Sequence, residues 1–413
     1  MMNLLAPTVS NKTLQGAAQL CCPCCGAAVA HQVYEALSVP VHSCILLSSR
    51  EEARSFTRRD LRLAHCEACG FVFNFSFDEA AMRYSTDFEE SQHFSGTFNS
   101  FAKTLAGEIA QKCAIAGRHV LEVGCGKGEF LRELCTQGNA TGLGIDPGYR
   151  KDEGRNDGDE NIDFIVDLFG PKYKNLSADV VLCRHTLEHI AAVAGFVRNI
   201  REMIGARTDT CVVFETPDVK RVLEEGAFWD IYYEHCSYFS PGTHARLFRQ
   251  EGFDVTDLSV VYDDQYILQY AIPTMRPTIT HLPLEKDLEQ VNELADRFIH
   301  RVSEVKNFWS ERVRRAWQDG RRIVLWGGGS KGVSFLTTLG LTEEVAAVVD
   351  INPYKQGKFV PATGHEVIAP TALSDIRPDL VIVMNPIYEN EVAANLRAMN
   401  LRSEVIALKP HRS

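Results

Sequence analysis

Long apolar runs, excess positive charge and repetition are all missing from this sequence. No apolar run is long enough to cross a membrane, and the first residues lack the basic flank and apolar core of a signal peptide. The formal net charge is −11, which argues against nucleic acid or an anionic membrane as the main partner. There is no internal repeat or low-complexity tract. We therefore expect a globular cytoplasmic protein.

The length and the cysteine content narrow this expectation. A chain of 413 residues is too long for one ordinary core, which predicts two or three domains. The 13 cysteines are numerous for a protein expected in the cytoplasm, where disulfides are rare. Because several of them occur in closely spaced pairs, they suggest a metal site.

Two matching Cys-x-x-Cys-Gly sequences occur at residues 22–26 and 66–70. The short spacer lets two thiolates face one ion, and the glycine allows the tight turn behind them. Two such pairs complete a tetrahedral four-cysteine zinc site, which is a structural type of site. The predicted ligands are Cys22, Cys25, Cys66 and Cys69.

Two alternatives stay open for these cysteines. Cys21 and Cys24 have the same spacing, but we prefer Cys22 and Cys25 because Gly26 follows them as Gly70 follows Cys69. The other alternative is a set of free cysteines in a small β unit. Spare candidate ligands are His31, His42 and His65.

The stretch 119–130 predicts a buried strand, a glycine-rich turn and a helix that begins near Glu129. Glycines in such a turn let a ligand approach the backbone, and the amides at the helix start favour polar or anionic groups. The next predicted strand ends at Asp146, where an acid can bind both hydroxyls of a ribose.

The pattern Glu-x-Gly-x-Gly-x-Gly followed by this acid resembles the class I S-adenosylmethionine (SAM) methyltransferases. The resemblance implies that SAM lies over the turn with Asp146 on its ribose. An ordinary nucleotide-binding βαβ unit is the alternative, although the turn does not fit the dehydrogenase pattern Gly-x-Gly-x-x-Gly. The predicted SAM-binding residues are Glu122, Gly124, Cys125, Gly126, Gly128, Asp146, Asp167 and Arg184.

Three further strands are predicted at 162–167, 179–183 and 211–217. Asp167 ends the first of them, where methyltransferases often contact adenine, and Arg184 follows the second. Ligands of open α/β sheets bind at this carboxyl edge. The third strand places Glu215 at the same rim, where it is a substrate-binding candidate.

The loop Tyr232-Tyr-Glu-His235 returns to this rim before Ser240, a good helix N-cap, and Pro241, a good first helical residue. It brings Tyr232, Glu234 and His235 together near the active edge. A structural or substrate-positioning histidine is the alternative to a catalytic one.

The polar and aromatic segment 84–94 could cover the active site, with Tyr84 and His93 as substrate-binding candidates. A surface connection is the alternative. Later in the chain, apolar residues recur every three or four positions from 284 to 317, which predicts a long amphipathic helix after a linker. That helix packs either between two domains or inside one.

A second strand, glycine turn and helix begin at Arg322. Gly327, Gly329 and Gly332 satisfy Gly-x-Gly-x-x-Gly, and Asp350 follows 18 residues later. Taken alone, the match indicates a dinucleotide site, but a single match of this kind is weak.

Taken in order, these motifs resemble the nucleotide-sugar C-methyltransferases that make branched deoxysugars. The most specific segments are 230–240, 329–332 and 349–358. The resemblance implies that His235 is the base that forms an enolate, that Tyr232 and Glu234 position the base or the sugar, and that zinc is structural. It also implies that the carboxyl unit holds the nucleotide-sugar, near Lys331, and binds no nicotinamide cofactor.

We therefore predict an α/β protein: a class I methyltransferase sheet preceded by a small zinc-binding β module and followed by a second Rossmann-like domain. The predicted function is SAM-dependent C-methylation of a nucleotide-linked keto-deoxysugar. An O- or N-methyltransferase is the alternative, and an NAD-dependent oxidoreductase is a third. The predicted parts are a zinc-binding module at 1–80, a SAM-binding domain at 81–272, a linker and long helix at 273–318, and a substrate-binding domain at 319–413.

Overall fold

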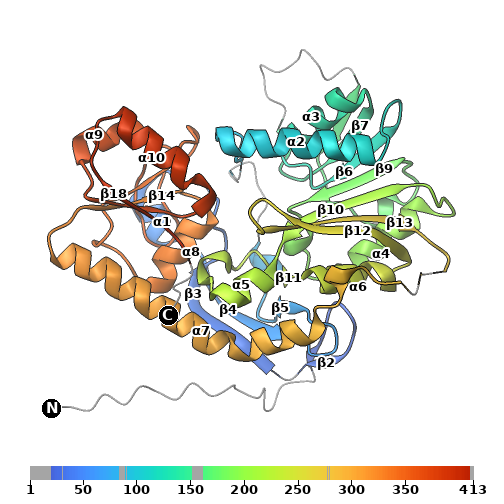
Figure 1. The fold of residues 1–413 in the computed structure, drawn as a ribbon, viewed down its shortest axis with the longest axis horizontal. Helices are drawn as coiled ribbons and strands as arrows, with labels where there is room; N and C mark the ends of the chain where they lie inside the picture. The colour runs from blue at the N-terminus through green and yellow to red at the C-terminus, as the bar shows by residue number, and fades with distance from the viewer. Residues whose placement is uncertain are drawn as a thin grey trace.

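The computed structural model describes residues 20–29, 31–82, 89, 91–150, 161–276, 278 and 280–409. Four β-sheets and ten α-helices form this part of the chain (Figure 1). Residues 151–160 lie outside the described residues.

The amino-terminal part holds two small antiparallel sheets. Strands β1 (Leu20–Cys21) and β2 (Ala28–Val29) pair with each other. Strands β3 (His31–Pro40), β4 (Arg58–His65) and β5 (Val72–Asn74) form the second sheet, and the short helix α1 (Arg50–Arg54) connects β3 to β4. The outer partner of β5 comes from far along the chain: it is β11 (Ser237–Tyr238), which directly follows the predicted catalytic loop.

The central sheet has seven strands in the order β12-β13-β10-β9-β6-β7-β8. The parallel strands are β6 (His119–Val123), β7 (Thr141–Ile145), β8 (Ile162–Ile165), β9 (Val180–Arg184) and β10 (Cys211–Pro217). Strand order reverses between β6 and β9, and such switch points are where open α/β sheets bind ligands. The hairpin of β12 (Phe253–Val261) and β13 (Tyr266–Pro273) completes the sheet, with β13 antiparallel to β10.

Helices cover both faces of this sheet because its strands are apolar on both sides. Val120 packs in one core with α2 (Gly96–Lys112) and α3 (Glu129–Gly138). Its neighbour Leu121 packs in another core with α4 (Val193–Ile204) and α6 (Pro241–Gln250).

The carboxyl-terminal sheet has five parallel strands in the order β16-β15-β14-β17-β18. They are β14 (Ile323–Trp326), β15 (Ala347–Val349), β16 (Val367–Ile368), β17 (Leu380–Val383) and β18 (Glu404–Ala407). The accompanying helices are α8 (Ser330–Leu339), α9 (Leu373–Ile376) and α10 (Glu389–Ala398).

The predicted long helix is α7 (Leu288–Gln318), which crosses the lower part of the molecule in Figure 1. Its buried Phe298 meets Tyr34 of β3 at a ring distance of 5.9 Å, and its Trp309 meets Phe335 of α8 at 5.7 Å. It also contacts α5 (Val219–Glu225). Of the two alternatives, the structure therefore favours a helix that packs between separate sheets.

Strand β5 ends at Asn74, because the Asn74 side chain accepts hydrogen bonds from the amides of Arg62 and Ser76 and turns the chain. The connection between β12 and β13 includes residues 262–264, which have positive φ.

Two of the 13 cysteines, Cys113 and Cys211, form a disulfide between the end of α2 and the start of β10. Among the described residues, no helix combines the length and apolar character that crossing a membrane requires.

Candidate functional site

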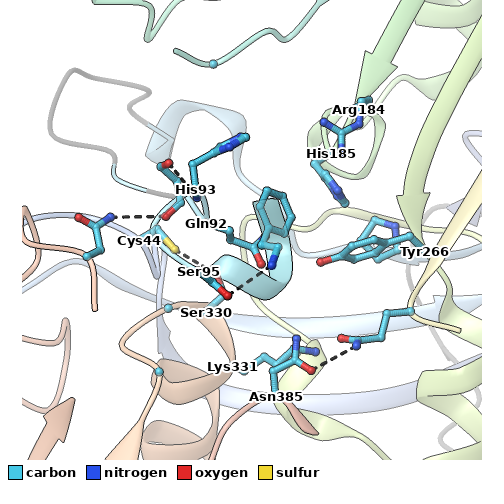
Figure 2. A pocket seen from close by; sticks show the side chains of 18 of the residues that line it. Cys44, Gln92, His93, Ser95, Arg184, His185, Tyr266, Ser330, Lys331 and Asn385 are labelled. Carbon is cyan, nitrogen blue, oxygen red and sulfur yellow. Dashed lines mark hydrogen bonds between the residues drawn. The ribbon is translucent and has the colours of Figure 1, made fainter. Parts of the chain in front are cut away.

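A cavity of about 400 Å³ lies between the carboxyl edges of the two larger sheets. Its walls come from the turn after β6, the end of β9, the loop before β11, residues 91–95 and the turn after β14. Figure 2 shows Arg184, His185 and Tyr266 on one side, and Ser330, Lys331 and Asn385 on the other.

The turn after β6 is shaped for a close backbone approach. Gly124, Gly126 and Gly128 all have positive φ, which favours glycine. A Cβ on Gly124 would lie 1.9 Å from the Thr186 hydroxyl, so no larger residue fits there. Asp146 accepts hydrogen bonds from the amides of Gly126 (2.9 Å) and Gly148 (2.7 Å), and the backbone thereby orients its carboxylate at the cavity.

The turn after β14 repeats this arrangement in the carboxyl-terminal sheet. Asp350 accepts hydrogen bonds from the amides of Gly328 (2.9 Å) and Asn352 (2.8 Å). Gly332 is obligatory for packing, because a Cβ there would lie 2.4 Å from the carbonyl oxygen of Gly327. Both glycine turns line the same cavity.

Buried ionisable side chains gather at the wall formed by the end of β9. The Arg184 Nε donates to Glu215, and its guanidinium lies 3.7 Å from the centre of the Phe130 ring. Burial alone would raise the pKa of Glu215, but the charges of Arg184 and His185 lower it to about 2. Glu122 is also buried, and burial raises its pKa to about 8.

His185 stands between two carboxylates at the end of β9. Its Nδ1 lies 3.6 Å from Glu188 and its Nε2 lies 3.5 Å from Glu215, while the ring meets Tyr266 edge-on at 4.4 Å. Burial would lower the pKa of His185, but Glu215 and Glu188 outweigh it and raise that pKa to about 9. This imidazole is therefore a cation at neutral pH.

His235 lies among aromatic rings at the cavity. Its ring meets those of Tyr232 at 4.6 Å and His189 at 4.8 Å, the latter at right angles. Burial, followed by the charge of His189, keeps the pKa of His235 well below its usual range. The ring is therefore neutral and able to accept a proton.

Glu234 points away from His235 into the amino-terminal part. Its carboxylate accepts hydrogen bonds from the Ser43 amide (3.2 Å) and hydroxyl, and it lies 3.0 Å from His42 Nδ1. Burial would raise the pKa of Glu234, but the hydrogen bonds of His42 and Ser43 help to lower it. Glu234 is thus a carboxylate that ties the loop to residues 42–43.

Lys331 donates to Asp230, which also accepts hydrogen bonds from Arg221 (2.6 Å) and the Tyr232 hydroxyl (3.1 Å). Asp230, on the short helix η4 (Phe228–Asp230), is only 9% exposed. Lys331 therefore lines the cavity while it is bound to Asp230, which precedes the loop 232–235.

Most of the sequence-predicted residues meet at this cavity, but not all. Two of the predicted contact residues lie outside the lining: Glu215 lies behind Arg184 and His185, and the Asp167 carboxylate is bound by Lys172 and Tyr173. Tyr84 lies outside the described residues, so its predicted role stays a prediction.

His93 does line the cavity, where its ring lies 3.5 Å from Glu129, as do Gln92 and Phe94 of the predicted covering segment. Sequence reasoning missed Tyr266 and Asn385, which also line it. No local motif marks either residue, because the hairpin β12–β13 and strand β17 bring them to the cavity only through tertiary folding.

The two cysteine pairs come together in the amino-terminal part. Sulfur atoms of Cys22 and Cys69, and of Cys25 and Cys66, lie 3.7 Å apart. A tetrahedral zinc ion with Zn–S bonds of about 2.3 Å needs sulfurs about 3.8 Å apart, so the cluster fits zinc. The preferred register is the one observed: the clustered ligands are Cys22, Cys25, Cys66 and Cys69.

The spare histidine candidates lie outside this cluster. His42 instead binds Glu234, and His31 lies 3.3 Å from Glu67. Gly26 and Gly70 have positive φ, and their amides donate hydrogen bonds to the carbonyl oxygens of Cys22 and Cys66. This tight turn explains the glycine after each pair.

His185 should stabilise the fold at acidic and neutral pH and lose this contribution in alkali. Its pKa of about 9 in the folded protein exceeds the ordinary value of about 6.5. The stabilisation is complete below about pH 6.5 and is lost as the pH rises through about 9. We expect His185→Asn to lower the free energy of unfolding by about 3 kcal/mol at pH 6 and by much less at pH 10.

Urea unfolding at both pH values checks this, with His300→Asn, at an exposed position of α7, as the control. An equal loss at the two pH values would contradict an electrostatic origin.

Comparison with known proteins agrees with this geometry. Residues 98–258 match the family described as a methyltransferase domain, and residues 280–407 match the C-methyltransferase C-terminal domain. The C-methyltransferase NovU of Streptomyces niveus is 26% identical over 293 residues, which is 68% of this chain and 69% of the relative.

Two solved structures are similar over part of the chain. One is a Burkholderia thailandensis 1,6-didemethyltoxoflavin-N1-methyltransferase, 16% identical, covering 42% of this chain and 78% of its own, with a TM-score of 0.33. The other is a Synechocystis magnesium protoporphyrin IX methyltransferase, 12% identical, covering 43% and 84%, with a TM-score of 0.34. The two family matches and the relative support the same conclusion: the chain is a SAM-dependent C-methyltransferase.

Proposed function

We propose that this C-methyltransferase acts on a nucleotide-linked keto-deoxysugar and methylates the carbon next to its ketone. The observation that carries the proposal is the single cavity between two glycine turns, with the neutral His235 in its wall. One turn suits SAM, and the other offers backbone amides and a cation to a second ligand. An imidazole between the two can act on a carbon held there.

SAM would lie over Gly124 to Gly128. Asp146 is oriented at that point by two backbone amides, and each of its oxygens has a further lone pair for a ribose hydroxyl. Glu122, Cys125 and Arg184 complete this part of the lining. Bound there, SAM supplies an activated methyl group.

The residues of this chain would then supply the base and the alignment. His235 takes the proton from the carbon, and the electron pair of that C–H bond becomes the enolate that attacks the methyl. The new carbon–carbon bond forms as the carbon–sulfur bond breaks, so the proton on His235 balances the charge. Glu234 acts as a positioning residue, since its carboxylate is bound to His42 and Ser43.

The second glycine turn would hold the nucleotide-sugar rather than a nicotinamide cofactor. Its resemblance to a dinucleotide turn is explained by the shared geometry of Asp350 and its two amides, which suits any ribose-bearing ligand. Tight NAD(H) binding by the parent protein that is lost when Gly329 is changed to a bulky residue would argue against this assignment of the turn. The cytoplasmic location also stays a prediction.

The four-cysteine cluster would hold one structural zinc. Four thiolates close the coordination shell and leave no open position for a substrate. The cluster also lies beside α6, where the Cys69 carbonyl accepts hydrogen bonds from Thr243 (3.0 Å) and Arg246 (3.1 Å).

Replacing Asp146 with Ala should weaken SAM binding. It removes charge-assisted hydrogen bonds worth about 1.5–3 kcal/mol each, so we expect affinity to fall at least tenfold. Titration calorimetry with SAM measures this. Asp163→Ala, at an exposed position of β8, is the control and should bind as the parent does. Unchanged affinity in the Asp146 variant would refute the placement of SAM.

Replacing Cys66 with Ser should abolish zinc binding and lower the midpoint of thermal unfolding. Elemental analysis of the parent should give one zinc per chain, and the variant should give close to none. SAM affinity should stay near the parent's, because the cluster does not line the cavity. Cys21→Ser, outside the cluster, should keep its zinc. Purified parent protein without zinc would exclude the metal site.

Replacing His235 with Asn should lower turnover by about 10²–10⁴-fold, the usual share of a general base, and leave SAM binding unchanged. Turnover is measured with a panel of thymidine diphosphate keto-sugars as candidate substrates. Exchange of the substrate proton for solvent deuterium, followed by NMR without methyl transfer, isolates the step. If the variant exchanges as fast as the parent, the base is another residue, and His189, whose ring lies 4.8 Å from that of His235, is the candidate.

A further inference from the structure

Asp230 joins three separate elements of the protein at the cavity. Its Oδ2 accepts a hydrogen bond from Arg221 of α5, and its Oδ1 accepts one from Lys331 in the first turn of α8. The same Oδ1 lies 3.1 Å from the Tyr232 hydroxyl. Because Asp230 is almost fully buried, these partners replace the water that the carboxylate lost.

The helix that carries Lys331 also holds the backbone of the loop. The Ser334 hydroxyl of α8 lies 2.9 Å from the carbonyl oxygens of both Phe228 and Ile231. The rings of Phe228 and Phe335 stack at 6.0 Å. Helix α8 therefore fixes the segment that precedes His235, even though the two lie about a hundred residues apart in sequence.

The charge of Asp230 decides the direction of the hydrogen bond with Tyr232. Burial would raise the pKa of Asp230, but Lys331 and Arg221 hold it far below its usual range, so the group is a carboxylate. An ionised carboxylate only accepts hydrogen bonds. Tyr232 must therefore donate its proton to Asp230, and its oxygen keeps a lone pair for another donor.

We propose that Lys331 is a positioning residue: acting through Asp230, it fixes the Tyr232 hydroxyl so that this oxygen accepts a hydrogen bond from a hydroxyl group of the substrate. The proposal rests on the proposed function, in which His235 is the base. Tyr232 lies against His235 at a ring distance of 4.6 Å, so a substrate hydroxyl bound to it is placed beside the base.

This role differs from the direct substrate contact that the sequence predicted for Lys331. A lysine that binds a phosphate of the substrate contributes to affinity. A lysine that orients Tyr232 contributes to alignment in the transition state, and a misplacement of about 1 Å can lower the rate about 100-fold. The two roles therefore separate in KM and kcat.

A double-mutant cycle between Lys331→Met and Tyr232→Phe tests the proposal with the keto-sugar panel. We expect Lys331→Met to lower kcat by about 10–100-fold, with little change in KM for the nucleotide-sugar. In the Tyr232→Phe background the same substitution should have almost no further effect, because its target is already gone. Lys331→Arg, which keeps a donor to Asp230, should recover much of the activity.

Two results overturn the proposal. One is a raised KM with unchanged kcat in Lys331→Met, which would mean that Lys331 binds the substrate directly. The other is an undiminished effect of Lys331→Met in the Tyr232→Phe background. Lys409→Met is the matched control, because Lys409 pairs with Glu389 on the surface of the same part of the chain.

Thermal unfolding without substrate separates this proposal from the proposed function. It is measured for the parent, Lys331→Met, Tyr232→Phe and the double variant. If Lys331 acts on Tyr232 through Asp230, the double variant lowers the midpoint by less than the sum of the shifts of the two single variants. Additive shifts overturn the positioning role even if methylation is observed. Non-additive shifts together with no turnover of any keto-sugar support the coupling of Lys331 to Tyr232 and refute the proposed substrate.

Discussion

A carboxylate that is taken out of water must find its partners inside the protein, and two such carboxylates fix the segment that carries His235. Asp230 finds its partners in α5, in α8 and in Tyr232. Glu234 finds its partners in His42 and Ser43 of the amino-terminal part. Unpaired, each would cost several kcal/mol, so the folded loop is bound to all three parts of the molecule. The cavity exists where these attachments meet.

The two glycine turns show why similar sequences can serve different ligands. In each, an acid after the second strand accepts two hydrogen bonds from backbone amides, one in the turn and one two residues beyond the acid. The donors to Asp146 are Gly126 and Gly148, and the donors to Asp350 are Gly328 and Asn352. This geometry orients a carboxylate at a sheet edge and does not by itself select the ligand. Selection comes from the surrounding side chains, which differ: Glu122 and Arg184 at one turn, Lys331 and Asn385 at the other.

The sequence was sufficient for the features that follow from local patterns. The glycine turn with Asp146, the helix start at Ser240, the register of the cysteine cluster and the C-methyltransferase family were all predicted, and the structure and comparisons confirm them. Each is marked by a fixed spacing or by a residue type with one physical role. For Glu215, strand position predicts the rim but not the partners of the side chain, and in the structure Arg184 and His185 cover its carboxylate.

The remaining features depend on contacts between distant segments. His42 was considered as a spare zinc ligand, and only the folded chain shows that it binds Glu234. Asp230 opens the most specific motif, yet nothing local indicates that Lys331, about a hundred residues later, is its partner.

The cysteine cluster bears on the chemistry through the same long-range pairing. From Cys69 the chain passes into β5, where Val72 and Phe73 pair with Tyr238 and Ser237 of β11, and the Asn74 amide donates to the Cys236 carbonyl. These backbone bonds lie within three residues of His235. A site that fixes the turn at Cys66–Gly70 therefore also fixes the strand that pairs with β11, directly after the loop 232–235, and Gly70 itself packs against Thr243 of α6. The proposed zinc, although it would lie outside the cavity, would in this way help to determine the position of His235.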